Sequence, residues 1–180
     1  MNNIRKTITI FGSSLPKQGD AEYEKAYLIG KLLAQNNFDI CSGGNQGIMD
    51  AVSKGSIENG GKAIGISVSI FNSIPSKYLT TKIECSTLYE RIDKLVQYGD
   101  AYLILPGGTG TLLELSVVWE LLNKNILEIK PVVCLGQMWK NIVYEMEKRI
   151  VIEKRKTDLI SCFDKVEDCI NYLKLILQNN

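Results

Sequence analysis

Short apolar runs alternate along the chain with longer segments in which apolar residues recur at helical spacing. The apolar runs, rich in β-branched residues, predict strands at residues 7–14, 38–44, 62–68, 101–108 and 130–136, with a weaker candidate at 82–87. The longer segments predict helices near residues 20–36, 47–59, 87–98, 111–124, 138–153 and 166–178. Because nearly continuous apolar strands separated by helices are typical of a parallel sheet covered on both faces, we expect an α/β fold.

We expect this fold to be one doubly wound, Rossmann-like domain over residues 1–180, with a mostly parallel sheet covered by helices on both faces. A chain of 180 residues, of which 45% are hydrophobic, is long and apolar enough for one core. No repeat, low-complexity tract or linker divides the sequence. The longest stretch without a regular pattern, residues 69–81, is expected to be a loop that covers the functional site.

Three of the predicted strands end in turns that contain glycine: "GSS" at 12–14, "SGGNQG" at 42–47 and "PGGTG" at 106–110. In an open parallel sheet the ligand binds beyond the carboxyl ends of the strands. Glycines there let a ligand approach the backbone closely, and the helix N-termini that follow favour a phosphate group. One such turn could equally serve a tight connection, but three at one edge favour a phosphate site.

The turn at 106–110 fits neither of two common nucleotide motifs. A G-x-G-x-x-G fingerprint that started at Gly108 would need glycine or alanine where Leu113 stands. The chain also has no GxxxxGK[ST] sequence, so a Walker-type nucleoside triphosphate site is not expected. We therefore expect a smaller phosphate ligand, such as a mononucleotide.

Charge and composition limit which partners, cellular location and cofactors are expected. Lys plus Arg number 21 against 20 for Asp plus Glu, a formal charge of +1, so neither nucleic acid nor a membrane is expected as a partner. The five cysteines form no CxxC pair and the chain starts without an apolar signal segment, which favours a cytoplasmic location. There is no histidine, so catalysis would rest on other side chains, and no metal or organic cofactor is expected.

The stretch "PGGTGTLLE" at 106–114 resembles the PGGxGTxxE motif of the LOG (Lonely Guy) family. The similarity extends to "FGSS" (11–14), "SGGNQGIMDAVSKGSIENGG" (42–61) and "ERIDKL" (90–95), and covers roughly residues 5–150. The resemblance implies a nucleoside 5′-monophosphate phosphoribohydrolase, which releases the free base from AMP or from a cytokinin riboside 5′-monophosphate. A looser relative, the molybdenum-cofactor carrier protein, leaves a non-catalytic binder of a phosphorylated molecule as the alternative.

Glu114 has two interpretations. The spacing Thr111-Leu-Leu-Glu114 fits a capping box, in which Thr111 caps the helix and Glu114 bonds back to the cap. The resemblance instead implies that Glu114 is a catalytic carboxylate at the sheet edge. With the resemblance added, we favour catalysis.

Arg91 also has two interpretations. On an amphipathic helix it could be a solvated side chain that pairs with Glu90 or Asp93. However, Arg91 precedes Pro106 by fifteen positions (106 − 91), the spacing that the resemblance assigns to the catalytic arginine. We therefore expect Arg91 to hold phosphate or ribose and to keep Glu114 ionised.

The remaining site residues come from the three turns. Glycine backbone, hydroxyl and thioether groups there are expected to bind the substrate and its phosphate: Gly12, Ser13, Ser14, Gly43, Gly44, Gly47, Met49, Gly107, Gly108, Thr109, Gly110 and Thr111. Asn45 and Gln46 could hold ribose or base, although amides and hydroxyls at such positions also cap helices. The helix that follows Thr111 is apolar on nearly every face, so it is buried either in the core or in a subunit interface. We expect the interface, in a homodimer or larger assembly anchored by Trp119 and Leu122.

Overall fold

A computed structural model describes residues 5–71 and 74–178, so residues 1–4, 72–73 and 179–180 lie outside the account. The strands are β1 (Lys6–Phe11), β2 (Phe38–Ser42), β3 (Ala63–Val68), β4 (Thr81–Cys85), β5 (Ala101–Ile104), β6 (Val132–Leu135) and β7 (Ile160–Phe163). The helices are α1 (Ala21–Gln35), α2 (Ile48–Glu58), α3 (Leu88–Tyr98), α4 (Thr109–Asn123), α5 (Gln137–Ile152) and α6 (Val166–Gln178).

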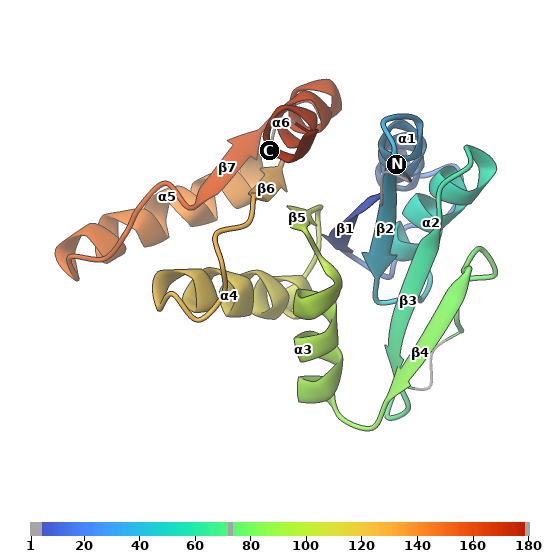
Figure 1. Ribbon diagram of the computed structural model, residues 1–180, viewed down its shortest axis with the longest axis horizontal. Coiled ribbons are helices and arrows are strands. Elements are labelled where there is room, and N and C mark those ends of the chain that lie inside the picture. Colours follow the sequence, from blue (N-terminus) through green and yellow to red (C-terminus); the bar gives the residue numbers. More distant parts are fainter. Residues whose placement is uncertain (1–4, 72–73, 179–180) are drawn as a thin grey trace.

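Within the described residues, the seven strands form one parallel sheet in the order β4-β3-β2-β1-β5-β6-β7 (Figure 1). This confirms the predicted doubly wound α/β fold, and each predicted strand and helix is present. The sequence pattern missed β7, which pairs with β6 at the sheet edge. Only Ile160 of its four residues is buried, and an edge strand needs fewer apolar residues than a central one.

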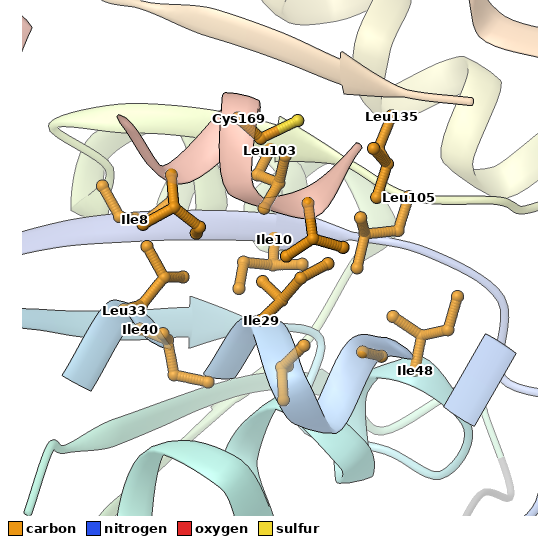
Figure 2. Packing of buried hydrophobic residues seen from close by; sticks show 14 of the residues in the cluster. Ile8, Ile10, Ile29, Leu33, Ile40, Ile48, Leu103, Leu105, Leu135 and Cys169 are labelled. Carbon is orange, nitrogen blue, oxygen red and sulfur yellow. The ribbon is translucent and has the colours of Figure 1, made fainter. Parts of the chain in front are cut away.

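The helices divide between the two faces of the sheet. One buried cluster joins α1, α2 and α6 to alternate strand residues, and Figure 2 shows Ile29 and Leu33 of α1 beside Ile8, Ile10 and Leu103 of the sheet. A second cluster joins α3, α4 and α5 to the other set of strand residues. Side chains alternate between faces along a strand, so each central strand contributes to both clusters.

The order of connections determines where a ligand can bind. From β1 the chain adds β2, β3 and β4 on one side, and then returns through α3 to place β5 on the other side of β1. The chain therefore changes direction between β1 and β5, and in open α/β sheets the crevice beyond such a point is the usual binding site. The β3–β4 connection, residues 69–80, contains no helix among its described residues.

The structure corrects one expectation about α4. Its residues Leu115, Val118, Trp119 and Leu122 are buried in the cluster beneath the sheet. Trp119 and Leu122 therefore pack in the core of the monomer and cannot anchor a subunit interface. The large apolar side chains that α4 leaves exposed are Leu112 and Leu113.

Candidate active site

A cavity of about 720 Å³ lies beyond the carboxyl ends of β1, β2 and β5. The three glycine-containing turns meet there, as the topology requires. The backbone N–H of Ser13 donates to the carbonyl of Pro106 at 3.0 Å, and the N–H of Ile48 donates to the carbonyl of Ser13 at 2.9 Å. The turns after β1, β2 and β5 are therefore joined into one rim by backbone hydrogen bonds.

Most of the predicted site residues line this cavity: Gly12, Ser13, Ser14, Gly43, Met49, Arg91, Gly108, Thr109, Gly110, Thr111 and Glu114. Three others lie behind the lining. Gly44 packs against Gly65, Gly47 packs against the backbone of Ser13 and Ser14, and Gly107 packs against Thr111. Gly44 and Gly47 have φ values of 69° and 73°, a backbone conformation that favours glycine, so they shape the β2–α2 turn.

The glycines at the cavity fall into two classes. At Gly12 a Cβ would overlap Ile48, and at Gly43 it would overlap the Nη2 atom of Arg91. At Gly108 and Gly110, no described atom lies within 4 Å of the place a Cβ would take. Only this second pair leaves open space beside bare backbone, so the turn after β5 is the one that a ligand can approach.

The N-terminus of α4 opens into this space. Gly108 is its N-cap, and within the described first turn there is neither a side-chain cap nor an acidic residue. The N–H groups of Thr109, Gly110 and Thr111 are thus the ones that a helix start leaves without an intrahelical acceptor. Such a helix end carries partial positive charge and suits an anion.

The capping-box interpretation of Glu114 is wrong. Helix α4 begins at Thr109, so Thr111 is the third helical residue rather than the cap, and Glu114 lies in the second turn. The Glu114 carboxylate instead accepts a hydrogen bond from Nη1 of Arg91 at 3.1 Å. Burial raises the pKa of Glu114, and the nearby Arg91 charge and hydrogen bond act in the opposite direction. We expected Arg91 to keep Glu114 ionised, but burial is the larger effect.

Arg91 is buried, with 7% of its surface exposed, so the solvated interpretation is also wrong. It lies on the face of α3 that carries Ile92 and Leu95 into the core. Its Nε atom donates to the carbonyl of Ile66 at 2.9 Å, and Nη1 donates to Glu114. The guanidinium therefore links β3 to α4 beside the cavity that Arg91 and Glu114 line.

The surface partners suggested for Arg91 bond to other groups. Glu90 pairs with Lys94 at 2.9 Å and accepts from the backbone of Ser86, and Asp93 accepts from Gln97. Arg91 thus contributes its buried charge to the site rather than to the helix surface.

Comparison with known proteins adds to this geometry. Residues 5–168 match the SLOG cluster4 family. The chain belongs to this family. The cytokinin riboside 5′-monophosphate phosphoribohydrolase of Rhodococcoides fascians is 29% identical over 137 residues, which are 73% of this chain and 68% of that protein. A probable enzyme of the same name from Oryza sativa subsp. japonica is 30% identical over 139 residues, 71% of this chain and 56% of that protein. The chain thus matches little more than half of the rice protein.

A solved structure shares the fold of this SLOG cluster4 protein. The molybdenum cofactor binding protein from Rippkaea orientalis superposes with a TM-score of 0.75 and 23% identity, over 96% of this chain and 98% of that one. At this identity the likeness shows the fold alone. The resemblance to LOG-type proteins that the sequence motifs indicated is confirmed by the family match and the curated relatives.

Several cavity residues of this family member were missed from the sequence. Ile10 and Phe11 at the end of β1, and Leu15 after it, line the cavity. Phe71 and Ile74 line it as well, and both belong to the stretch 69–81 that was expected to cover the site. Residues 72–73 of that stretch lie outside the described part. The position of Ile10 and Phe11 just before a glycine turn was the available signal.

The described residues also bear on metals and membranes. Among them, no group of three or more histidine, cysteine, aspartate or glutamate side chains is placed to hold a metal ion. In the same part of the chain, no helix has the length and hydrophobicity to cross a membrane.

Proposed function

We propose that this chain hydrolyses the N-glycosidic bond of a nucleoside 5′-monophosphate, such as AMP or a cytokinin riboside 5′-monophosphate. The products are the free base and ribose 5-phosphate. One observation carries the proposal: the buried Glu114–Arg91 pair and the open N-terminus of α4 face the same cavity. The relatives named phosphoribohydrolases support a hydrolase.

The phosphate is assigned to the start of α4. The N–H groups around Gly108, Gly110 and Thr111 would hold it, because this helix end is uncapped and its glycines have room beside them. A phosphate held there anchors the ribose through atoms that do not react, so binding energy orients the sugar over Glu114.

The chemistry is assigned to Glu114. As the bond from C1′ to the base breaks, positive charge develops on the sugar, and a nearby carboxylate stabilises it. Water then adds its hydroxide to C1′, and its proton balances the negative charge on the departing base. An ionised Glu114 can accept that proton in transit, and its raised pKa makes the carboxylate a stronger base near neutral pH.

Arg91 is assigned to positioning Glu114 and to contacting the ribose. Its Nη1 bond fixes one carboxylate oxygen, and its Nε bond to Ile66 fixes the guanidinium on the sheet. Since Arg91 also lines the cavity, its remaining N–H groups can meet a sugar hydroxyl.

The direct test is incubation with a panel of nucleoside monophosphates followed by detection of free base. We expect AMP to be cleaved at least ~10-fold faster than adenosine, because only AMP carries the group that the α4 N-terminus holds. Equal rates would contradict the assignment of the phosphate.

The alternative is a non-catalytic binder or carrier of a phosphorylated small molecule. It is favoured by the shared fold of the molybdenum cofactor binding protein, which this chain matches over almost its full length. A binder needs the α4 N-terminus but not the pairing of Glu114 with Arg91. Tight nucleotide binding without release of base would favour it.

We also propose that the chain forms a homodimer or larger assembly in the cytoplasm. All five cysteines, each in the described part, are free thiols, which fits a reducing compartment. Because Trp119 and Leu122 are buried in the monomer, an interface on α4 would use Leu112 and Leu113. Sedimentation at micromolar concentration tests the assembly, and a monomer would contradict it.

A further inference from the structure

Part of the β3–β4 connection is fixed to α1 and α2 by a buried chain of hydrogen bonds. The Ser76 hydroxyl donates to Oδ1 of Asp50 at 2.7 Å, and the Tyr23 hydroxyl donates to Oδ2 of Asp50 at 2.6 Å. The N–H of Ser76 donates to the carbonyl of Gly44, and the N–H of Tyr78 donates to the Ser76 hydroxyl. Tyr23, Asp50 and Ser76 are each at most 9% exposed.

Gln46 makes a second attachment to the same segment. Its Nε2 atom donates to the carbonyls of Ile74 and Pro75, each at 3.2 Å. Gln46 and Ile74 line both the main cavity and a neighbouring cavity of about 530 Å³, so the contact lies in the wall between them. Because no helix holds the described parts of the β3–β4 connection, residues 74–78 depend on these bonds for their position.

The segment lies at the opposite end of the cavity from the α4 N-terminus. Helix α4 follows β5, whereas the segment bonds to Gly44 and Gln46 of the β2–α2 turn, and β1 lies between β2 and β5 in the sheet. Neighbouring strands are about 4.8 Å apart, so the two ends are separated by roughly 10 Å along the sheet edge. The Arg91–Glu114 pair links β3 to α4 and lies between these ends.

We propose that Tyr23, Asp50 and Ser76 form a latch that holds residues 74–78 as the wall of the nucleobase end, and so set affinity for the base. The inference rests on the proposed function, because a phosphate at α4 with the sugar over Glu114 directs the base towards Ile74. Asp50 and Ser76 are positioning residues in this assignment. They act through the segment that they hold.

The first test is Ser76→Ala, which removes the hydroxyl that joins the segment to Asp50. Calorimetry measures the affinity of the variant for AMP and for ribose 5-phosphate, a probe with the phosphate and sugar but no base. We expect AMP affinity to fall by about fivefold, the scale of one lost hydrogen bond. The affinity for ribose 5-phosphate should stay within about twofold, because α4 is unchanged. In turnover assays KM should rise while kcat is nearly constant.

Two tyrosines of α1 provide a matched pair of variants. Tyr23 donates to Asp50 at the start of α2, and Tyr27 donates to Glu58 at its end, at 2.8 Å. Tyr23→Phe and Tyr27→Phe therefore each remove a tyrosine–carboxylate bond between the same two helices, a buried bond in the first variant and an exposed one in the second. We expect AMP affinity to fall only in Tyr23→Phe, and an equal fall in both variants would overturn the latch.

The remaining outcomes separate this inference from the proposed function. Equal weakening of AMP and ribose 5-phosphate in Ser76→Ala, or no weakening of AMP, overturns the latch. The expected binding pattern in a protein that releases no base overturns the hydrolase and leaves the latch standing. A wild-type chain that binds the two ligands equally overturns the assignment of the base end, and one that binds neither overturns both proposals.

Discussion

The β2–α2 turn and the β5–α4 turn look alike in sequence but differ in what fills them. Both follow a buried strand, contain glycines and lead into a helix N-terminus at the same cavity. In the β2–α2 turn, the space beside Gly43 is taken by Arg91, and Asp50 in the first turn of α2 holds Ser76 and Tyr23. In the β5–α4 turn, Gly108 and Gly110 have no described neighbour in the corresponding space.

The difference shows that glycine in such turns serves two purposes. At Gly43 the absent side chain makes room for another part of the protein, a catalytic guanidinium in our proposal. At Gly108 and Gly110 it leaves room for something outside the protein. In the first turn of α2 the chain itself supplies an acidic side chain. The described first turn of α4 has no acidic side chain, so this helix end can bind a negatively charged group of a ligand.

The largest effect on turnover is expected for Glu114→Gln, which tests whether the cavity at the two turns is a catalytic site. Glutamine keeps an acceptor oxygen for Nη1 of Arg91, so we expect the free energy of unfolding to fall by only ~1 kcal/mol. It carries no negative charge for the sugar and cannot act as a base, so turnover should fall ~100-fold or more. The measurements are release of free base and a denaturant unfolding curve. Normal turnover in this variant would leave the non-catalytic binder as the better account.

The next largest effect is expected for a substitution in the β2–α2 turn. In Gly43→Ala the new methyl group would overlap the Arg91 guanidinium, which must then shift, and we expect the shift to disturb its bond to Glu114. We expect the free energy of unfolding to fall by about 1–3 kcal/mol, as for other overpacked sites. Turnover should fall ~10-fold, because Glu114 loses its fixed orientation. A variant with unchanged stability and turnover would show that Arg91 does not need this space.

A glycine-to-alanine substitution in the β5–α4 turn should lower ligand affinity without lowering stability. Gly110 lies in the first turn of α4 with free space beside it, so Gly110→Ala should keep or raise stability by up to ~1 kcal/mol. Its methyl group would stand where the phosphate is assigned, so we expect AMP affinity to fall ~5-fold. Thermal unfolding and calorimetry measure the two effects. If AMP binds Gly110→Ala and wild type equally, the phosphate lies elsewhere.

The fold and the meeting of the candidate site residues at one cavity could be predicted because both follow from local patterns. The alternation of apolar strands with helices gave the order of elements, and parallel topology then placed the three glycine turns at one edge. Strand β7 was missed because only one residue of its sequence, "ISCF", is buried. The strand also pairs with a neighbour on one side only, β6.

The division of labour among the site residues could not be predicted, because it depends on contacts between distant parts of the chain. Gly43 meets a side chain from α3, and Asp50 meets Ser76 from the β3–β4 connection. The role of Glu114 depended on where α4 begins. Gly108 is the N-cap residue, without a side-chain cap, and the helix begins at Thr109. Spacing alone gave Glu114 the geometry of a capping box that the helix does not have.

The smallest effect is expected in how Glu114 makes stability depend on pH. The sign of this effect follows from the burial of Glu114. Burial raises the pKa of Glu114 in the folded state, so between the ordinary glutamate pKa of about 4.3 and the raised value the folded chain binds more protons than the unfolded chain. Stability contributed by this group is therefore lost as pH rises through that window. Glu114→Gln has no such group, so its stability relative to wild type should increase as the pH rises from about 4 to the raised pKa of Glu114.

The same pKa gives a kinetic expectation with the opposite direction. If the ionised carboxylate acts on the sugar and on water, kcat/KM should rise with pH through the raised pKa of Glu114. The acid limb of the profile should therefore lie above about pH 4.3, and it should be absent from the residual activity of Glu114→Gln. Denaturant curves and initial rates across this range check both signs. Because kcat/KM reports the free enzyme, a limb at the ordinary glutamate pKa would mean that Arg91 outweighs burial, and that Glu114 acts as a fixed negative charge rather than as a base.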